Sequence, residues 1–423
     1  MAVAHGPPGL SSAVGRPILE TAVTRRRLAV LLVLAALASP VAAGAQQTPL
    51  QARLAKALRV PHVAPARSGA VAMDLATGTV LFTQNPAVPL APASNEKLPI
   101  TYAALVNLGA SYRIETDVFG EGSQDAATFD GTLVLKGGGD PTLSTAGLRA
   151  LAAQVRAAGI RRVTGGIVGD ESYFDARRTV AGWKPSFYIQ ESPPLSALVV
   201  NRARVGRYVT RTPALAAATA FRAALRTAGV VVDGGSSVGR VDDFSIPLAQ
   251  IESPPLASIL RFMDKESDNF TAELLLKQLG AVVLDHGTSA AGAAVVMQTL
   301  GEGGVPLTAV RIVDGSGLSR LDRLTANAIA GILRAAWNDP AVRPTFLAAL
   351  PVAGVSGTLE DRLRRPPARG RVLAKTGTTS DASALSGYVS TRFLFTVLQN
   401  GHPLPYWWAR RAQDQFVTVL ARA

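Results

Sequence analysis

Strand-like patterns stand at both ends of this sequence, and their placement limits the folds that the chain can adopt. Residues 68–84 alternate around Thr77-Gly78, which is typical of a β-hairpin. A helix pattern follows at 94–109 and is closed by Gly109. Strand patterns return near the other end at 371–379, 384–391 and 392–399, before a closing helix at 405–423, and helical periodicity marks 255–263, 270–279, 289–300, 324–337 and 343–350.

These elements predict an α+β domain assembled from both ends of the chain. One five-stranded antiparallel sheet with helices on its faces, beside a helical lobe, would use all of them. The secondary-structure pattern changes between 112 and 249. Short strand candidates (114–120, 131–137, 165–170) occur there among helix candidates (146–160, 214–230). We therefore expect a discontinuous domain of residues 46–111 and 250–423, interrupted by an inserted α/β region at 112–249.

The N-terminus has the pattern of a secretory signal. A basic cluster at Arg25–Arg27 precedes an apolar core at Leu28–Ala38 and the small residues Ala43-Gly44-Ala45. This order predicts a signal peptide at 1–45 and an exported protein, periplasmic or associated with the cell wall. The alternative is a membrane anchor, although the apolar core is short for a span.

The composition excludes several kinds of active site. The chain has no cysteine, which excludes cysteine nucleophiles, thiolate metal sites and disulfides. Its four histidines show no ligand spacing, so we expect no metal, no cofactor and no Ser-His-Asp triad. The net charge of +13 suits an anionic partner. Dispersed arginines without a nucleic-acid-binding motif argue against nucleic acid, so an anionic cell wall or membrane face fits better.

Ser94 and Lys97 are the first candidates for catalysis. At this spacing on a helix, two side chains lie ~5–6 Å apart on one face. A serine attacks poorly unless a neighbour takes its proton, and a lysine can do so only when burial or a nearby cation keeps it neutral. Only seven of the 43 basic residues are lysines, which favours a chemical role for Lys97. The alternative is a helix-capping serine beside a solvated lysine.

A second motif, Ser267-Asp268-Asn269, lies between two helix patterns. A loop at this point can project a hydroxyl and a carboxamide into a cleft. The alternative is a helix cap at Asn269, completed by Glu273 in a capping box.

The third motif, Lys375-Thr376-Gly377-Thr378, lies on a strand pattern and follows no phosphate-binding glycine motif. A lysine with two hydroxyls spaced by two along one strand face makes a receptor for a carboxylate. Gly377 would let a substrate backbone pair with the strand edge. The alternative is an ordinary exposed edge strand.

In this order, the three motifs resemble the S-x-x-K, S-D-N and K-T-G signatures of penicillin-binding proteins and serine β-lactamases. Further stretches are similar to class C low-molecular-mass penicillin-binding proteins, the carboxypeptidases and endopeptidases of peptidase family S13. The resemblance covers nearly all of the expected mature chain and implies a penicillin-binding, transpeptidase-like fold. The stretches are GGGDPTLS (137–144), AGW (181–183), VDGSGLSR (313–320), LPVAGVSGTL (350–359) and KTGTTSDASALSGYV (375–389).

The resemblance implies a role for each matched residue. Ser94 would be acylated, with Lys97 as its base. Ser267 would pass protons, and Asn269 would hold the substrate amide and Lys97. The carboxylate receptor would be Lys375, Thr376 and Thr378, and the oxyanion hole would be the backbone N–H groups of Ser94 and Thr378.

The resemblance also implies a pocket for the charged end of a diaminopimelate side chain, made by Arg320, Asp170 and Tyr173 or Phe174. A structural ion pair is the alternative for Asp170 and Arg320. The sequence departs from the family after 199–204, where a longer β-rich stretch is usual, so we expect a shortened insert.

The activity that the resemblance implies is a serine-type D-Ala-D-Ala carboxypeptidase, with D,D-endopeptidase activity as a further option. Its partners would be peptidoglycan stem peptides, with β-lactams as inhibitors. One alternative is a β-lactamase or esterase on the same fold, although no glutamate-based deacylation motif is recognisable. Another is a non-catalytic sensor that only binds stem peptides or penicillin, which a degraded motif would favour; all three motifs are intact.

Overall fold

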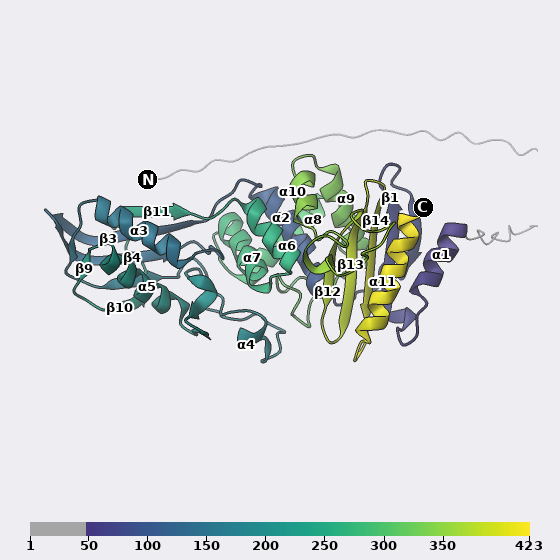
Figure 1. Ribbon diagram of the computed structural model, residues 1–423, viewed down its shortest axis with the longest axis horizontal. Coiled ribbons are helices and arrows are strands. Elements are labelled where there is room, and N and C mark those ends of the chain that lie inside the picture. The colour runs from purple at the N-terminus through teal and green to yellow at the C-terminus, as the bar shows by residue number, and fades with distance from the viewer. Residues whose placement is uncertain (1–47) are drawn as a thin grey trace, which may run out of the picture. The chain divides into compact units, whose positions relative to one another are not determined.

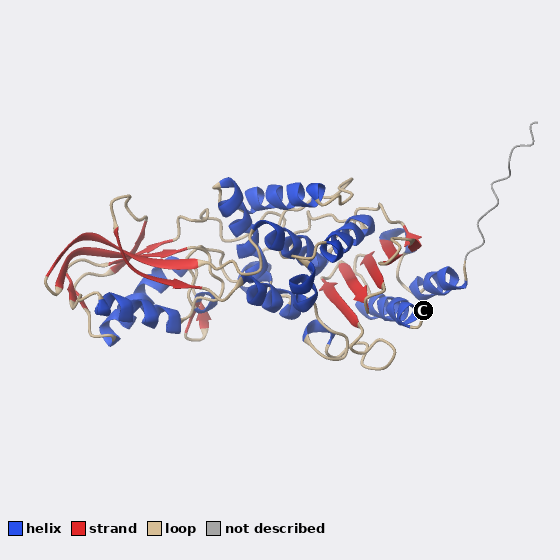
Figure 2. Cartoon of the chain, turned by 90° about the horizontal axis from the view of Figure 1, so that it is seen from above, coloured by secondary structure: helices blue, strands red, loops and turns tan. Residues whose placement is uncertain are grey.

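The computed structural model describes residues 48–423, and the predicted signal peptide at 1–45 lies outside the described residues. Residues 47–423 form one compact unit. Within it, two separate sheets divide the chain into the regions that position the candidate site (Figures 1 and 2).

The first sheet joins the two ends of the described chain. The sheet has five antiparallel strands, as the sequence predicts. Their order is β12-β13-β14-β1-β2, so β1 from the beginning of the chain pairs with β14 from its end. β12 is therefore an edge strand. The bounds are β1 (Ser68–Asp74), β2 (Val80–Gln84), β12 (Val372–Thr378), β13 (Ala382–Val389) and β14 (Phe393–Asn400).

The two faces of this sheet pack against different helices because side chains alternate along each strand. On β14, the buried Phe395 and Val397 face the core beneath α1 (Pro49–Leu58) and α11 (Tyr406–Ala421). The alternate residues Leu394 and Leu398 face the larger core of the helical lobe. The helices of this lobe are α2 (Lys97–Asn107), α6 (Leu256–Glu266), α7 (Asn269–Leu284), α8 (Ser289–Glu302), α9 (Ala326–Asn338) and α10 (Arg343–Ala349).

The helix expected from residue 94 begins later. Residues Ala93–Glu96 form a 3-10 turn, η2, and α2 starts at Lys97. Pro99 has no N–H to donate to the carbonyl of Asn95, so regular helical bonding cannot extend back through this residue. Three further 3-10 turns are η1 (Pro65–Arg67), η3 (Asn201–Ala203) and η4 (Gly357–Leu359).

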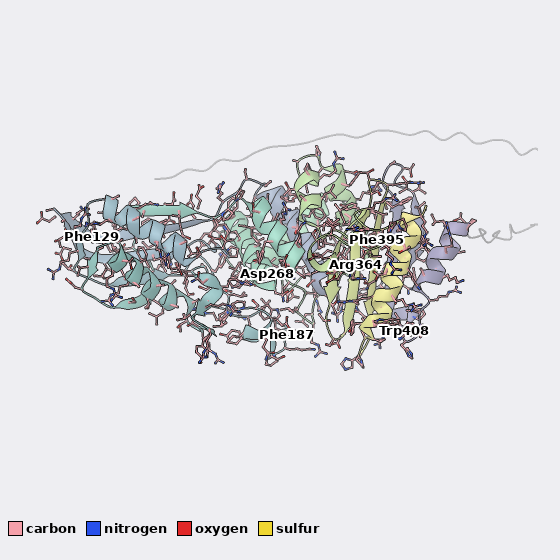
Figure 3. All side chains as sticks on the ribbon, viewed as in Figure 1. Phe129, Phe187, Asp268, Arg364, Phe395 and Trp408 are labelled. Atoms are coloured by element: carbon pink, nitrogen blue, oxygen red, sulfur yellow. The ribbon has the colours of Figure 1, made fainter. Side chains whose placement is uncertain are left out.

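The inserted region forms the second sheet, which has its own core around Phe129 and Phe221. Figure 3 labels Phe129 in this region. The order β10-β6-β4-β3-β11 mixes parallel and antiparallel pairs, with β5 and β9 beside it. Its strands are β3 (Glu115–Asp125), β4 (Thr128–Gly137), β5 (Arg162–Val163), β6 (Ile167–Asp170), β9 (Val231–Val232), β10 (Ser236–Gly239) and β11 (Ile246–Glu252), and the helices are α3 (Thr145–Ala157), α4 (Phe187–Gln190) and α5 (Pro213–Thr227).

The second sheet extends slightly beyond the residues expected for the insert. β11 pairs with β3 as far as Glu252, three residues beyond the predicted boundary at 249. Where a shorter segment was expected, the chain forms only the small hairpin β7 (Arg204–Val205) and β8 (Tyr208–Val209). The domain boundaries themselves stay a prediction.

Within residues 48–423, no single helix has the length and apolar character needed to cross a bilayer, although α7 and α8 together reach that length across a 76° bend. The same residues contain no group of three or more His, Cys, Asp or Glu side chains that could hold a metal ion.

Close packing of α7 on α8 depends on Gly292, and we predict that Gly292→Ala destabilises the protein. A Cβ at this position would overlap the carbonyl oxygen of Leu276 on α7. Forcing a buried atom into a packed contact costs about 1–3 kcal/mol, more than the helix propensity that alanine gains. Thermal unfolding followed by circular dichroism should show a lower midpoint.

The matched control is Gly301→Ala on the same helix, where the nearest atom to the added Cβ is at 3.5 Å, an ordinary contact. This variant should unfold at the wild-type temperature or slightly above it. Equal midpoints for the two variants would contradict the packing argument.

Candidate active site

Ser94 and Lys97 lie together beneath the edge of the first sheet. Lys97 is fully buried at the start of α2, and its Nζ lies 3.1 Å from Ser94 Oγ. The turn η2 that carries Ser94 is tied to the sheet by Asn95, whose Nδ2 donates to the carbonyl of Lys375 at 2.9 Å. The predicted pair is therefore held at hydrogen-bond distance on a rigid base.

The other contacts of Lys97 show how it can act as a base. Its Nζ donates to Asn269 Oδ1 at 2.9 Å and to the carbonyl of Ser316 at 2.8 Å. Both partners only accept, so they use the two N–H bonds of a neutral amine. The lone pair is then left for the Ser94 hydroxyl, which is the arrangement that general-base catalysis needs.

The carboxamide of Asn269 is oriented by the inserted region. Its Nδ2 donates to the carbonyl of Glu191 at 3.1 Å, which turns Oδ1 towards Lys97. The helix-cap alternative for Asn269 is wrong, because Asp268 caps α7 by accepting from the backbone N–H of Thr271. Glu273 does not complete a capping box; its buried carboxyl accepts from the backbone N–H groups of Gly315 and Ser316.

Ser267 occupies a strained position between α6 and α7. Its φ of 57° lies in the left-handed region, which a serine adopts only where the surroundings impose it. The next residue is clamped, because the guanidinium of Arg202 donates to both oxygens of Asp268, at 3.1 and 2.6 Å. This clamp presents the Ser267 hydroxyl to Lys375, whose Nζ donates to it at 2.8 Å.

The strand β12 brings the third motif to the same place. Alternation sets Thr376 and Thr378 on one face and Lys375 with Gly377 on the other, so the lysine and the threonines do not share a face. Lys375 is fully buried and reaches Ser267, whereas Thr378 is exposed. Thr376 Oγ1 donates to the hydroxyl of Thr358 at 2.7 Å, which adds a third hydroxyl to the predicted carboxylate receptor.

The outer edge of β12 is open to a substrate backbone beyond residue 374. Thr379 donates its N–H inward to Ala382 of the hairpin, whereas Ala374 donates outward to Pro351. Since backbone groups alternate along a strand, the N–H of Thr378 points outward, where no other strand pairs with it. A peptide can add here as a further strand, with this N–H in the position of an oxyanion donor.

Gly377 is required for a reason other than the one expected. Its missing Cβ would lie 2.9 Å from the carbonyl oxygen of Pro92 and 3.0 Å from the backbone nitrogen of Ser94. The glycine therefore lets β12 approach η2 closely, which brings the two candidate oxyanion donors together.

Burial changes the protonation of the charged groups in the site. Burial lowers the pKa of Lys97, and burial together with the nearby Lys97 lowers the pKa of Lys375 to about 7. Burial also raises the pKa of Asp264 to about 6 and that of Glu273 to about 8. Asp264 and Glu273 are thus held partly neutral, which weakens their tendency to keep the Lys97 amine charged. Asp268 differs, because its hydrogen bonds from Arg202 outweigh the effect of burial and lower its pKa.

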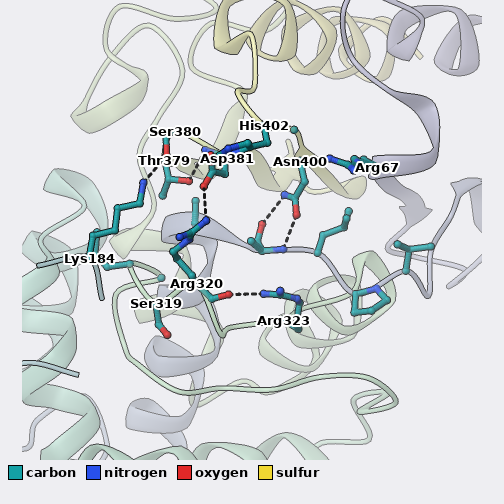
Figure 4. A pocket seen from close by; sticks show the side chains of 18 of the residues that line it. Arg67, Lys184, Ser319, Arg320, Arg323, Thr379, Ser380, Asp381, Asn400 and His402 are labelled. Atoms are coloured by element: carbon teal, nitrogen blue, oxygen red, sulfur yellow. Dashed lines mark hydrogen bonds and ion pairs between the residues drawn. The ribbon is translucent and has the colours of Figure 1, made fainter. Parts of the chain in front are cut away.

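A cavity of about 490 Å³ opens beside Ala93, next to the nucleophile (Figure 4). Lys184 reaches into it from the inserted region and donates to Ser380 at 2.9 Å. Arg320 also lines the cavity, 3.8 Å from the carboxylate of Asp381, and its side chain is 59% exposed. Arg320 therefore lines an accessible pocket, and its predicted role in binding substrate stays a prediction.

Asp170 and Phe174 are not brought to this pocket. Asp170 has no exposed surface, and its carboxyl accepts from the backbone N–H groups of Ser172 and Val241 within the insert. Phe174 is buried against Phe270 and Leu274 of α7. The pocket expected from these two residues with Arg320 needs correction, because both are part of the internal packing.

Comparison with known proteins decides the family. The chain matches the D-Ala-D-Ala carboxypeptidase 3 (S13) family over residues 50–212 and 205–423. The D-alanyl-D-alanine carboxypeptidase of Actinomadura sp. is 33% identical over 86% of this chain and 83% of its own length.

The chain belongs to the S13 peptidase family.

Another relative and two solved structures agree with this assignment. Carboxypeptidase DacB of Mycolicibacterium smegmatis is 34% identical, over 75% of this chain and 72% of its own length. The structure of penicillin binding protein 4 from Haemophilus influenzae has a TM-score of 0.78 at 22% identity, covering 89% of this chain and 99% of that one. A predatory peptidoglycan endopeptidase from Bdellovibrio bacteriovorus gives 0.55 at 18%, covering 79% and 86%. These two likenesses confirm the predicted fold.

Several residues of this S13 site were not singled out from the sequence. Ser316 and Glu191 act through their carbonyl groups, which leave no trace in residue identity. Asp314 accepts from the Trp183 indole at 2.7 Å, which joins the AGW and VDGSGLSR stretches. Each of these two stretches could be recognised in the sequence as a motif, but the hydrogen bond between them is visible only in the structure.

We predict a bell-shaped pH dependence for acylation of the S13 site by penicillin. Lys97 must be neutral to act as a base, so the rate should rise with pH until this amine is deprotonated. Lys375 must be charged to attract a carboxylate, so the second-order rate constant should fall at higher pH as Lys375 loses its proton. Its pKa is about 7 while Lys97 is charged and rises once Lys97 is neutral, which leaves a pH range in which both forms are correct. Stopped-flow or gel-based labelling from pH 5 to 9.5 measures both limbs.

Lys97→Arg provides the comparison for the acidic limb, because a guanidinium keeps its proton throughout this range. It should be unreactive at every pH while it still unfolds cooperatively. A wild-type rate that does not change with pH would contradict the assigned roles of the two lysines.

We also predict that Gly377→Ala slows acylation by about a hundredfold to a thousandfold. The added methyl group would push β12 away from the Ser94 backbone nitrogen, and loss of one oxyanion donor costs on the order of 10²–10³ in rate. The measurement is the rate constant for labelling by a fluorescent penicillin. Gly235→Ala is the control, since its Cβ would meet no atom within 4 Å; equal rates for the two variants would refute the interpretation.

Proposed function

We propose that this protein is a serine-type D-Ala-D-Ala carboxypeptidase that acts on peptidoglycan stem peptides and is acylated by β-lactams. One observation carries the proposal: Lys97 Nζ lies 3.1 Å from Ser94 Oγ while its other two bonds go to groups that only accept. Membership of the S13 family and the names of the relatives support the substrate class.

The reaction follows from this geometry. Ser94 Oγ attacks the carbonyl carbon of the D-Ala-D-Ala bond, and its proton passes to the lone pair of Lys97. The oxyanion accepts from the backbone N–H groups of Ser94 and Thr378. When the C–N bond breaks, the leaving D-Ala amine takes a proton from Ser267, and Lys375 replaces it by donating a proton to the Ser267 oxygen. Water then hydrolyses the ester and releases the shortened peptide. The proton lost by this water returns through Ser267 to Lys375, and Lys97 returns its proton to Ser94 Oγ, which restores the free enzyme.

A β-lactam enters the same pathway but does not complete it. Opening of the four-membered ring acylates Ser94 while the leaving amine stays attached to the acyl group. The amine therefore cannot diffuse away to admit water from that side. A penicillin-acylated structure of a Bdellovibrio endopeptidase, whose TM-score to this chain is 0.54, supports acylation on this fold.

The pocket beside the nucleophile suits a substrate side chain that ends in a carboxylate. Its lining includes the cations Arg67, Lys184, Arg320 and Arg323 and a single acid, Asp381. Asp381 is already approached by His402 at 3.0 Å as well as by Arg320. The residue that precedes the D-Ala-D-Ala pair would direct its side chain here.

The signal-like pattern at 1–45 supports the proposal that the protein acts outside the cytoplasm, where stem peptides are found.

We predict that Ser94→Ala abolishes both penicillin labelling and release of D-Ala from a diacetyl-Lys-D-Ala-D-Ala peptide. Without the hydroxyl no acyl-enzyme can form, and residual activity should be at least a thousandfold below wild type. Labelling is read by gel fluorescence and D-Ala by a coupled oxidase assay. Ser123→Ala, at an exposed strand position, is the control that should keep both activities.

The same assays separate the alternatives. Rapid turnover of penicillin by the wild type would instead indicate a β-lactamase, and peptide binding without D-Ala release would indicate a sensor. Labelling that persists in Ser94→Ala would rule out this serine as the nucleophile.

A further inference from the structure

A second cavity lies on the other side of the first sheet, between α1 and α11. Its volume is about 940 Å³, and its wall is strongly basic. The two helices pack against each other, as Figure 1 shows, and each contributes cations to the groove. Seven basic residues and one acid line it: Arg53, Lys56, Arg59, Arg362, Arg410, Arg411 and Arg422, with Asp414.

The single acid in this groove is already neutralised. Asp414 accepts from Arg362 at 2.7 Å. None of the other six cations has an ion-pair partner among residues 48–423. The groove therefore carries a concentrated positive charge that the described protein does not balance.

Two basic side chains in the groove are short of acceptors. Nε of Arg362 and Nε of Arg410 are both buried without a hydrogen-bond partner among the described residues. Partial burial and the neighbouring Arg362 also lower the pKa of the Arg410 guanidinium. An anion in the groove would relieve this repulsion, and arginines bind phosphate groups well because their planar N–H groups match two phosphate oxygens.

Large aromatic side chains lie at the N-terminal end of α11, next to Arg410 and Arg411. Trp407 lines the groove and is 55% exposed, and its neighbour Tyr406 is 54% exposed. The guanidinium of Arg411 lies 5.4 Å from the centre of the Trp407 ring. Exposed tryptophan and tyrosine beside arginine and lysine are typical of surfaces that sit at the level of lipid headgroups.

The groove lies away from the candidate active site. α1 and α11 cover the face of the sheet that is opposite to the helical lobe, whereas Ser94 and Lys97 lie on the side of that lobe. A partner that covers α11 would leave the outer edge of β12 accessible to a substrate. A surface bound at the groove would leave the nucleophile free to meet its substrate.

We propose that the groove between α1 and α11 docks the protein on a membrane surface rich in anionic phospholipid. Phosphate headgroups contact Arg53, Lys56 and Arg411, and Trp407 enters the interface between headgroups and acyl chains. The attraction is electrostatic and is screened by salt. The docking is independent of the hydrolytic activity.

The test uses residues 47–423, which form one compact unit and lack the apolar N-terminal segment. Cosedimentation is measured with vesicles of phosphatidylcholine alone and with vesicles that contain 30% phosphatidylglycerol. We expect binding to the anionic vesicles only, weakened by raising NaCl from 50 to 300 mM. The triple variant R53E/K56E/R411E should bind at least tenfold more weakly, and Trp407→Ala should reduce binding with little change in salt dependence.

The matched control is R149E/R226E/R240E, which changes the net charge equally at exposed arginines of the insert. It should bind like the wild type, and every variant should keep the wild-type rate of penicillin acylation, which shows that it is folded. Equal loss of binding in both triple variants, equal binding to neutral vesicles, or capture by soluble polyphosphate without binding to vesicles would overturn the proposal.

Discussion

Two buried amines share the active site, and the rest of its chemistry depends on this constraint. Lys97 and Lys375 have no exposed surface, and they are close enough for the charge of one to lower the pKa of the other. Both cannot hold a proton without a large electrostatic cost. The surrounding bonds assign the two states: Lys97 meets two acceptors and a nucleophilic hydroxyl, whereas Lys375 donates to the Ser267 hydroxyl and to the carbonyl of Thr376. Burial of both lysines therefore favours a neutral Lys97, which can act as a base, together with a charged Lys375, which can attract the substrate carboxylate.

The inserted region takes part in this arrangement. Its Glu191 carbonyl orients the Asn269 carboxamide, and its Arg202 holds Asp268 in a two-point contact. Trp183 fixes the loop that offers the Ser316 carbonyl to Lys97. The insert therefore stabilises the second motif and the loop beside it. This is consistent with a match to the S13 family that extends across the insert as well as the first sheet.

The first sheet has different tasks at its edge and on its outer face. The edge of β12 is unpaired beyond Ala374 and can bind an extended peptide. The outer face is covered by α1 and α11, whose cations remain unbalanced within the described chain. The edge of β12 and the face covered by α1 and α11 have only the sheet in common. Hydrolysis of a peptide at the edge and binding of a membrane at the covered face therefore need not interfere.

The sequence by itself determined the local elements and predicted the reactive groups. Alternation predicted the hairpin at 68–84 and the strands near the C-terminus, and motif order predicted Ser94, Lys97, Ser267, Asn269 and Lys375. These signals are local, because neighbouring residues alone specify the side-chain period of a strand or helix, and each residue type has its own chemistry. Only the tertiary structure decided that Asp268 rather than Asn269 caps α7, that Asp170 and Phe174 belong to the interior, and that Gly377 is needed to admit the Ser94 backbone. Those outcomes depend on which backbone groups and side chains, far apart in the sequence, come into contact after folding. The hydrogen-bond partners of a residue and the space around it are set by these contacts and cannot be read from the residue alone.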